Sequence, residues 1–318
     1  MRRWNVHGAA VEIACDSPDL AELVARRLAA FPAGANQANI HIEIASEGAI
    51  VRAERPADTR IVHQAPRGAV AYSDSHDTLW VDYEGAAARC MPQVGRGEIT
   101  VDRRVPGWQW TATRPLLTLT LIELLKRRSL FAIHAAAAAR DGGAVLFAGR
   151  SGSGKSTAAL TLLLGGWPLL GDDLLFLRGD ETALRVLGFP DEIDAADATI
   201  GRFAELAPPE RWPMLAGYPK HQLPPQELRE GAVALEATPR LVLVPQIADR
   251  ADHSLEPLAA DQLLLELLPN VIFTARAPAQ TQLDLLARLA GSVPAFRLAL
   301  GGDMSRLEGV VEAALAEL

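Results

Sequence analysis

Apolar and polar residues alternate along three segments in the first third of the chain, and this pattern predicts half-buried β-strands. The segments are ANIHIEIAS at residues 38–46, DTLWVDYEG at 77–85 and GEITVDRR at 97–104. The apolar run at 4–15 also favours a strand. At 17–19, a serine, a proline and an aspartate predict a helix N-terminus, and apolar residues continue at helical spacing to residue 31. Residues 1–112 are therefore expected to form a small α+β domain.

The pattern changes after the Pro-Gly pair at 106–107, which indicates a domain boundary. An amphipathic helix is predicted over 115–128, followed by strands and helices in the alternating order of an α/β domain. We therefore expect a second, nucleotide-binding α/β domain over residues 113–318. The six prolines between 207 and 230 predict a long ordered loop, and a capped amphipathic helix is expected to end the chain.

The sequence GRSGSGKS at residues 149–156 matches the phosphate-binding pattern G-x-x-x-x-G-K-[ST] in full. Its glycines allow backbone N–H groups to surround phosphate oxygens, Lys155 would reach the β- and γ-phosphates, and the Ser156 hydroxyl would bind Mg²⁺. A strand predicted at 144–148 and an apolar helix at 156–166 flank the loop, which a flexible Gly/Ser linker does not explain. The expected nucleotide-binding residues are Gly149, Ser151, Gly152, Ser153, Gly154, Lys155, Ser156 and Thr157.

Two strand-like runs surround an Asp-Gly pair at 141–142, which favours a two-residue hairpin turn. With that turn, the pairing register places His134 opposite Gly149, at the mouth of the phosphate loop. A turn at 142–143 would instead place His134 opposite Ser151. The alanine run between His134 and the turn could also form a helix, and a single histidine is often only a core residue.

Asp172 and Asp173 interrupt an apolar run, WPLLGDDLLFLRG, that follows the predicted phosphate-loop helix. Two adjacent carboxylates in a buried segment are costly unless a cation or a reaction uses them. Because neighbours on a strand point to opposite faces, one acid can face Mg²⁺ and the phosphates while the other faces elsewhere. One acid would suffice for the metal, so the second is a candidate general base for an incoming hydroxyl. The alternative is an ordinary turn between two short strands.

His134, the loop G-x-S-G-S-G-K-S-T and the sequence G-W-P-L-L-G-D-D together resemble the HPr kinase/phosphorylase family over residues 130–178. The resemblance implies a core related in fold to phosphoenolpyruvate carboxykinase, with ATP and Mg²⁺ bound. It also implies that Asp172 is the general base for a serine hydroxyl and that Asp173 lies on the metal side. Lys155 would bind the phosphates, and His134 would assist near the transferred phosphoryl group.

The sequence departs from that family in two places. Thr157 stands where the HPr kinases usually have glutamate, and their later E-I-R-G-x-G-I signature is absent. The chain therefore more closely resembles divergent relatives in bacterial peptide-modification gene clusters. Among these are kinases that phosphorylate the C-terminal serine of lasso-peptide precursors.

Lys220 lies in the proline-rich segment, in the sequence GYPKHQLPP. It could swing over the site and bind a phosphate or a substrate carboxylate. His221 and Arg211 are weaker candidates for the same role. A solvated loop lysine without a function explains Lys220 equally well.

The composition narrows the function classes. The 318 residues carry a net charge of −8, which argues against a generally basic nucleic-acid binder. The two cysteines, Cys15 and Cys90, require no disulfide framework and fit a reducing compartment. No apolar run is long enough for a spanning helix, and the first residues lack a signal-peptide pattern. We therefore expect a cytoplasmic protein that binds neither nucleic acid nor membrane.

Together these features predict an ATP-dependent kinase that acts on a serine hydroxyl of a peptide or protein partner. A nucleotide-dependent switch and a small-molecule kinase are the alternatives. The sequence leaves open the identity of the acceptor, the preference for ATP or GTP, and the oligomeric state.

Overall fold

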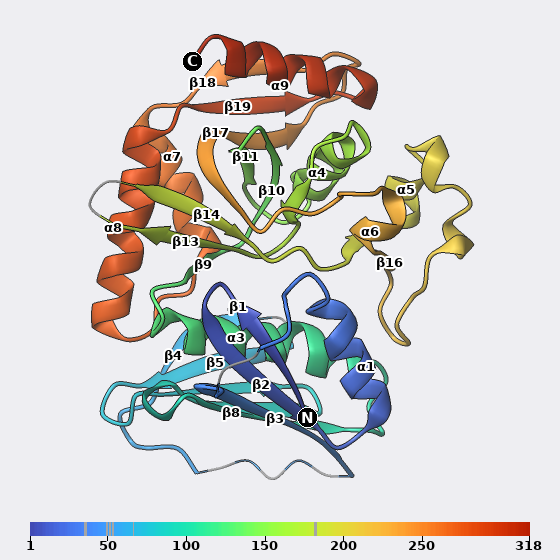
Figure 1. Cartoon of the computed structure of the whole chain (residues 1–318). Helices are drawn as coiled ribbons and strands as arrows, with labels where there is room; N and C mark the ends of the chain where they lie inside the picture. The colour runs from blue at the N-terminus through green and yellow to red at the C-terminus, as the bar shows by residue number, and fades with distance from the viewer. Residues whose placement is uncertain (35–36, 49, 51, 53, 66, 181–182) are drawn as a thin grey trace. The chain divides into compact units, whose positions relative to one another are not determined.

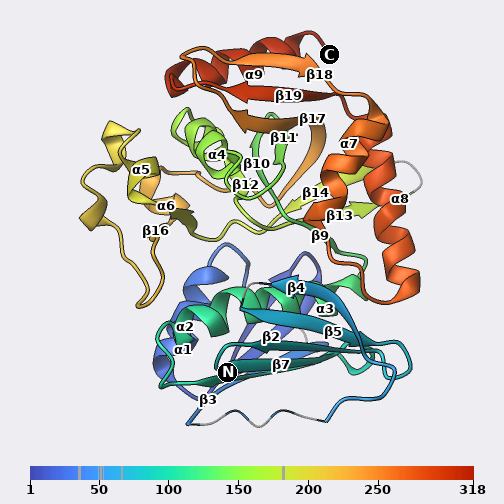
Figure 2. The same cartoon turned by 180° about the vertical axis from the view of Figure 1, so that it is seen from behind.

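The computed structural model describes the whole chain except residues 35–36, 49, 51, 53, 66 and 181–182. It divides into two compact units. Unit 1 contains Met1–Phe131, Met214–Pro219 and Ile272–Gln280, and unit 2 contains Ala132–Pro213, Lys220–Val271 and Thr281–Leu318. Each unit combines helices with a mixed sheet, so the chain is a mixed α/β protein (Figure 1 and Figure 2). Among the described residues, no helix has the length and apolarity needed to cross a membrane.

Unit 1 is built on an eight-stranded sheet in the order β1-β2-β3-β8-β7-β6-β5-β4. Its strands are β1 Arg2–Val6, β2 Ala9–Cys15, β3 Ile40–Glu47, β4 Arg60–Ala65, β5 Gly68–Ser73, β6 Thr78–Tyr83, β7 Ala86–Met91 and β8 Arg96–Asp102. Strand β3 pairs in parallel with both β2 and β8. Its residues Ile40, Ile42 and Ile44 are buried, whereas His41 and Glu43 between them are exposed. The three alternating segments thus form strands, as predicted.

Unit 1 differs from the sequence-based expectation in two features. The run at 4–15 is a hairpin rather than one strand, because His7 and Gly8 turn the chain with φ of +51° and +93°. The helix expected to open the second domain belongs to unit 1, whose first segment extends to Phe131. A Cβ on Gly97 would lie 2.4 Å from Thr120 Cγ2, which shows how closely this helix approaches the sheet.

The helices of unit 1 are α1 Pro18–Arg27, α2 Trp108–Thr111 and α3 Leu117–Lys126. Helix α1 begins after Ser17, as predicted. A short π-helical turn over residues 112–116 contains Pro115 and links α2 to α3. The residues of α3 that lie at helical spacing are buried, which explains why its apolar pattern was readable in the sequence.

Unit 2 contains a nine-stranded sheet whose main path runs β12-β10-β11-β17-β14-β13-β9, with β19 beside β17 and β18 beside β19. The strands are β9 Phe131–Ile133, β10 Ala135–Arg140, β11 Gly143–Ala148, β12 Leu169–Gly171, β13 Leu175–Gly179, β14 Leu184–Gly188, β17 Glu236–Ile247, β18 Ser254–Pro257 and β19 Ala295–Leu300. Strand β11 pairs antiparallel with β10 and parallel with β17. Strands β15 Ile193–Ala195 and β16 His221–Leu223 form a separate small sheet.

The predicted hairpin is confirmed. Strands β10 and β11 meet at the Asp141-Gly142 turn, and Arg140 pairs with Gly143. The alanine run forms a strand rather than a helix, because β11 and β12 flank it and helix α4 (Lys155–Leu164) packs against it (Figure 1). All five alanines are almost completely buried, so the space between these elements admits only small side chains.

The remaining helices are α5 Asp197–Ile200, α6 Pro225–Leu228, α7 Ala260–Leu267, α8 Arg276–Ser292 and α9 Leu307–Ala316, and all belong to unit 2 except residues 276–280 of α8. Helix α9 is the helix that was predicted at the end of the given sequence. Leu162 of α4, Phe147 of β11, Leu243 of β17 and Val311 of α9 belong to one buried cluster. This core anchors both ends of the segment between β11 and α4, where the glycine-rich sequence lies.

Candidate active site

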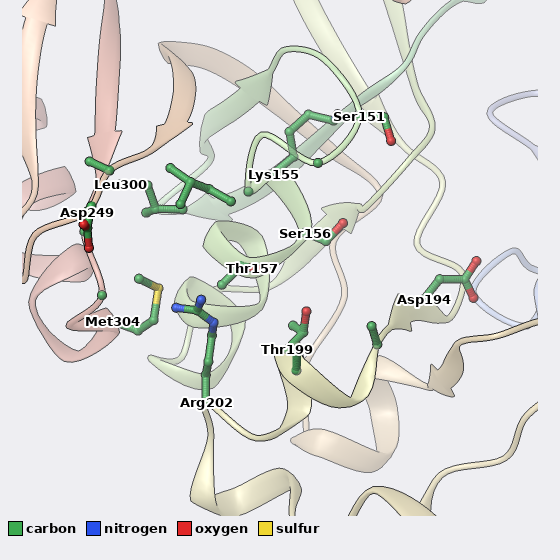
Figure 3. A pocket seen from close by; sticks show the side chains of 18 of the residues that line it. Ser151, Lys155, Ser156, Thr157, Asp194, Thr199, Arg202, Asp249, Leu300 and Met304 are labelled. Carbon is green, nitrogen blue, oxygen red and sulfur yellow. The ribbon is translucent and has the colours of Figure 1, made fainter.

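The glycine-rich segment between β11 and α4 bends through residues with positive φ (Figure 3). Gly152 has a φ of +78° and open space where a Cβ would stand. Gly154 has a φ of +105°, and a Cβ there would lie 2.5 Å from Leu300 Cδ2. Only glycine adopts such conformations without strain. At Gly152 the main chain of the loop therefore borders open space.

Lys155 begins helix α4 and folds back onto the loop. Its Nζ donates hydrogen bonds to the main-chain oxygens of Gly149 at 2.8 Å and Arg150 at 3.1 Å. Burial lowers the pKa of the Lys155 ammonium and the charge of Lys220 lowers it further, whereas the nearby carboxylates of residues 172 and 173 raise it. The lysine thus lies within electrostatic reach of both predicted acids and of Lys220.

A cavity of about 990 Å³ opens beside the loop. The sequence-predicted residues in its wall are His134, Ser151, Gly152, Gly154, Lys155, Ser156, Thr157, Asp173 and Lys220. Gly149, Ser153 and Asp172 lie in the same loop or beside it without lining the cavity. The structure therefore brings most of the predicted residues around one space, although they come from segments far apart in the sequence.

The two aspartates occupy a bend between β12 and β13, and their surroundings differ. Asp172 is only 2% exposed, and burial raises its pKa well above the usual range. The charges of Asp173, Asp194 and Asp191 raise this pKa further, whereas a hydrogen bond with the Ser156 hydroxyl lowers it. Asp172 is therefore held against the start of α4.

Asp173 points into the cavity, and its side chain is 55% exposed. His134 Nδ1 donates a hydrogen bond to the main-chain oxygen of Asp173 at 2.9 Å. Because a carbonyl oxygen can only accept, Nδ1 carries the proton. The other ring nitrogen, Nε2, lies 3.9 Å from Asp173 Oδ1. His134 thus holds the bend that carries both acids.

Two candidates from the proline-rich segment, His221 and Arg211, do not line the cavity either. His221 is 6% exposed, and its Nδ1 donates to Trp212 O at 2.9 Å while its Nε2 lies 2.8 Å from Asp197 Oδ1. Both ring nitrogens are therefore used in joining β16 to α5 and to the proline-rich segment. Arg211 lies over the Trp212 ring, with its Cζ 4.6 Å from the centroid. Their neighbour Lys220 does line the cavity.

Sequence reasoning missed five polar residues in the cavity wall, namely Asp194, Thr199, Arg202, Asp249 and Arg250. Asp194 comes from β15, Arg202 follows α5, and Asp249 lies just after β17 (Figure 3). The only local signal is the cluster of acids at 191–194, which directly follows a buried strand. Arg202 stands in an ordinary polar segment, and only the folding of the chain brings it to the site.

The residues of the site fit Mg²⁺ and a nucleotide. Asp172 Oδ1 is buried without a hydrogen-bond partner among the described residues, and the same carboxyl contacts the Ser156 hydroxyl. Carboxylate and hydroxyl oxygens suit Mg²⁺, which usually takes one or two protein ligands together with phosphates and water. Accordingly, no described group of three or more His, Cys, Asp or Glu residues is arranged to hold a metal alone. Asp172 and Ser156 would hold the ion, and Lys155 would hold the phosphates.

Comparison with known proteins gives little further information. No family model matches the chain, and no curated protein matches it. Among solved structures, the Hpr(Ser) kinase/phosphatase from Coxiella burnetii aligns with 58% of this chain and 97% of its own, at 15% identity and a TM-score of 0.32. A likeness at that TM-score carries no argument about function, so function has to be inferred from the residues of the site.

Proposed function

We propose that the protein is an ATP-dependent kinase that transfers the γ-phosphoryl group to a serine hydroxyl of a peptide or protein, such as a lasso-peptide precursor. One observation carries the proposal: a buried carboxylate beside Ser156 and an exposed carboxylate in the cavity wall, beside His134, both act electrostatically on Lys155. A nucleotide switch needs only groups that bind the nucleotide. The exposed acid adds a group that can take a proton from an incoming hydroxyl.

We assign the two aspartates the opposite roles from those that the family resemblance implies. Asp172 is buried against Ser156, so it is suited to hold Mg²⁺ and is shielded from an acceptor that enters from solvent. Asp173 is exposed to the cavity, so a hydroxyl can approach its carboxylate. Asp173 is therefore the general base in this proposal, and Asp172 is the metal ligand.

The other residues of the site act on charge and position. When bound, Mg²⁺ neutralises charge on the β- and γ-phosphates. The Lys155 ammonium exchanges its two main-chain acceptors for phosphate oxygens and stabilises the charge that spreads during transfer. His134 positions Asp173 through the hydrogen bond to its main-chain oxygen, so that the carboxylate can accept the hydroxyl proton. Lys220 adds a second positive charge near Lys155.

The proposal is tested by incubating the protein with Mg-ATP and peptides that end in serine, and by measuring the intact mass of each peptide. The same peptides with alanine in place of serine serve as controls. We expect phosphate on the serine peptides only, and none with the Lys155→Met protein. Slow ATP hydrolysis with no phosphorylated peptide would contradict a serine kinase and favour the switch.

Two further variants separate the roles of the acids. Asp173→Asn should reduce transfer about 100-fold or more, the usual contribution of a general base, while Mg-ATP binding is kept. Asp172→Asn should weaken the Mg²⁺-dependent part of nucleotide binding. Full transfer by Asp173→Asn, together with lost transfer but normal Mg-ATP binding by Asp172→Asn, would restore the roles that the family resemblance implies.

A further inference from the structure

The cavity is larger than the phosphate site, and its second end has a different chemistry. Lys155, Asp173 and Lys220 interact electrostatically at one end. The other end is formed by the termini of β17 and β19 and by the segment that follows α5, and it contains aliphatic side chains. Because the lysine of such a loop binds the β- and γ-phosphates, the rest of a nucleotide has to extend away from the two acids.

Three apolar side chains form a shelf at this second end, namely Ile247, Leu300 and Met304. Leu300 and Met304 are buried, whereas Ile247 is 67% exposed. A Cβ on Gly154 would lie 2.5 Å from Leu300 Cδ2 and 3.7 Å from Ile247 Cγ1, so the shelf is continuous with the phosphate loop. An exposed isoleucine beside a phosphate loop gains free energy when a flat apolar group covers it.

Arg202 stands at the same end. Figure 3 shows its guanidinium directed into the cavity, toward Met304 and Thr157. Within the part of the chain that the structure describes, the Arg202 guanidinium has neither an ion-pair partner nor a hydrogen-bond acceptor. A planar guanidinium without a protein partner can stack on an aromatic ring.

The wall around the shelf is fixed by hydrogen bonds of its own main chain. Ala248 N donates to Leu300 O at 2.9 Å, and Gly302 N donates to Arg250 O at 2.8 Å. Gly301 N donates to His253 Nδ1 at 3.0 Å. These amides are therefore already used, and polar contacts at this end are left to side chains of the wall such as Asp249 and Arg250. The aliphatic shelf and the Arg202 guanidinium remain as surfaces for the rest of a ligand. Such surfaces bind the faces of a ring rather than its polar edge.

We infer that this end of the cavity holds the purine nucleoside of the nucleotide, with Arg202 stacked on one face of the base and the shelf of Ile247, Leu300 and Met304 against the other. The inference rests on the proposed nucleotide-dependent function, but it concerns binding only. It can hold even if the protein transfers no phosphoryl group.

The test compares two ligands, Mg-ADP and inorganic Mg-tripolyphosphate, which lacks the nucleoside. Dissociation constants are measured by calorimetry with the full-length protein. Arg202→Ala and Ile247→Ser should each weaken Mg-ADP binding about tenfold, the effect of losing one stacking or apolar contact, and leave tripolyphosphate binding within about twofold. Lys155→Met should weaken both ligands. Leu265→Ser and Arg240→Ala are matched controls, because Leu265 is 68% exposed, Arg240 is exposed, and neither lines the cavity.

Three outcomes would contradict the inference, and a fourth would contradict only the proposed function. Unchanged Mg-ADP binding by both variants would place the nucleoside elsewhere. Equal losses for Mg-ADP and tripolyphosphate in Arg202→Ala would make Arg202 a phosphate ligand instead. Failure of the unmodified protein to bind Mg-ADP would overturn both this inference and the proposed function. Normal Mg-ADP binding without transfer to any hydroxyl would overturn the kinase proposal alone.

Discussion

Replacing Asp172 with asparagine should make the ligand-free protein more stable, even though it removes a residue of the proposed site. Asp172 is 2% exposed, and its Oδ1 has no hydrogen-bond partner among the described residues. Burial and the charges of Asp173, Asp194 and Asp191 raise its pKa well above the usual range. Asparagine keeps the shape of the side chain and removes the charge, and its amide can donate to a neighbouring carboxylate.

The size of the effect follows from the cost of a buried, incompletely bonded polar group, about 1–3 kcal/mol. A free-energy change of 1 kcal/mol shifts the unfolding midpoint of a unit of this size by about 2–4 °C. The midpoint should therefore rise by roughly 2–12 °C at pH 8. The Asp173→Asn protein is the matched comparison, because Asp173 is exposed and should shift the midpoint less.

The pH dependence of this difference has a definite sign. A carboxyl with a raised folded-state pKa binds more protons in the folded state, so the stability of the unmodified protein falls as pH rises above the unfolded value of about 3.9. The two proteins should therefore have similar stability near pH 4 and differ increasingly toward pH 8. Thermal unfolding in EDTA across that range measures the difference. An Asp172→Asn protein that is equally or less stable at pH 8, or a gap that does not change with pH, would refute the reasoning.

Three further substitutions test the packing and charge of unit 2. Gly154→Ala should lower the free energy of unfolding, measured in urea, by about 1–3 kcal/mol, because residue 154 has a positive φ and the added Cβ would contact Leu300. The double variant with Leu300→Ala should regain the part of that loss that is due to the contact. Ala137→Leu should lower the free energy of unfolding by about 1–3 kcal/mol in the same measurement, because Ala137 is fully buried between β11 and β12. An unchanged urea midpoint would show that the core has room for the larger side chain. Lys155→Met should leave the unfolding midpoint unchanged or slightly raised, since burial disfavours the ammonium, but it should abolish stabilisation by Mg-ATP. A midpoint that still rises with Mg-ATP would contradict the role of Lys155 as a phosphate ligand.

The parts of the fold that were predicted correctly carry local signals. The Asp-Gly pair at 141–142 specified a two-residue turn, and that turn set the register of β10 and β11. The loop between β11 and α4 and the start of α1 were readable for the same reason, although the Ser17 hydroxyl makes no capping hydrogen bond. The turn at His7-Gly8 was missed because the apolar run continues through it on both sides.

The parts that were not predicted depend on contacts between distant segments. The sequence showed that α3 is amphipathic, but not which sheet its apolar face covers. Arg202, Ile247 and Met304 reach the cavity from three separate segments, and none stands in a recognisable motif. Asp172 and Asp173 lie in a bend between two short strands, the alternative that the sequence left open, and only the packed structure shows that Asp172 is the buried one.

In the described part of the chain, the lysine and the aspartates of the site do not pair with one another, and this favours a role in binding ligands. Within the described residues, no ion pair joins Lys155 to Asp172 or Asp173, and the ammonium is satisfied by main-chain oxygens instead. The buried carboxylate of Asp172 faces other acids, and burial disfavours the charge of both Asp172 and Lys155. A polyanion at the lysine and a divalent cation at the carboxylate would relieve both costs together. A protein that only needed a stable fold would gain by pairing these groups directly, so the unpaired arrangement favours a site for Mg²⁺ and a nucleotide.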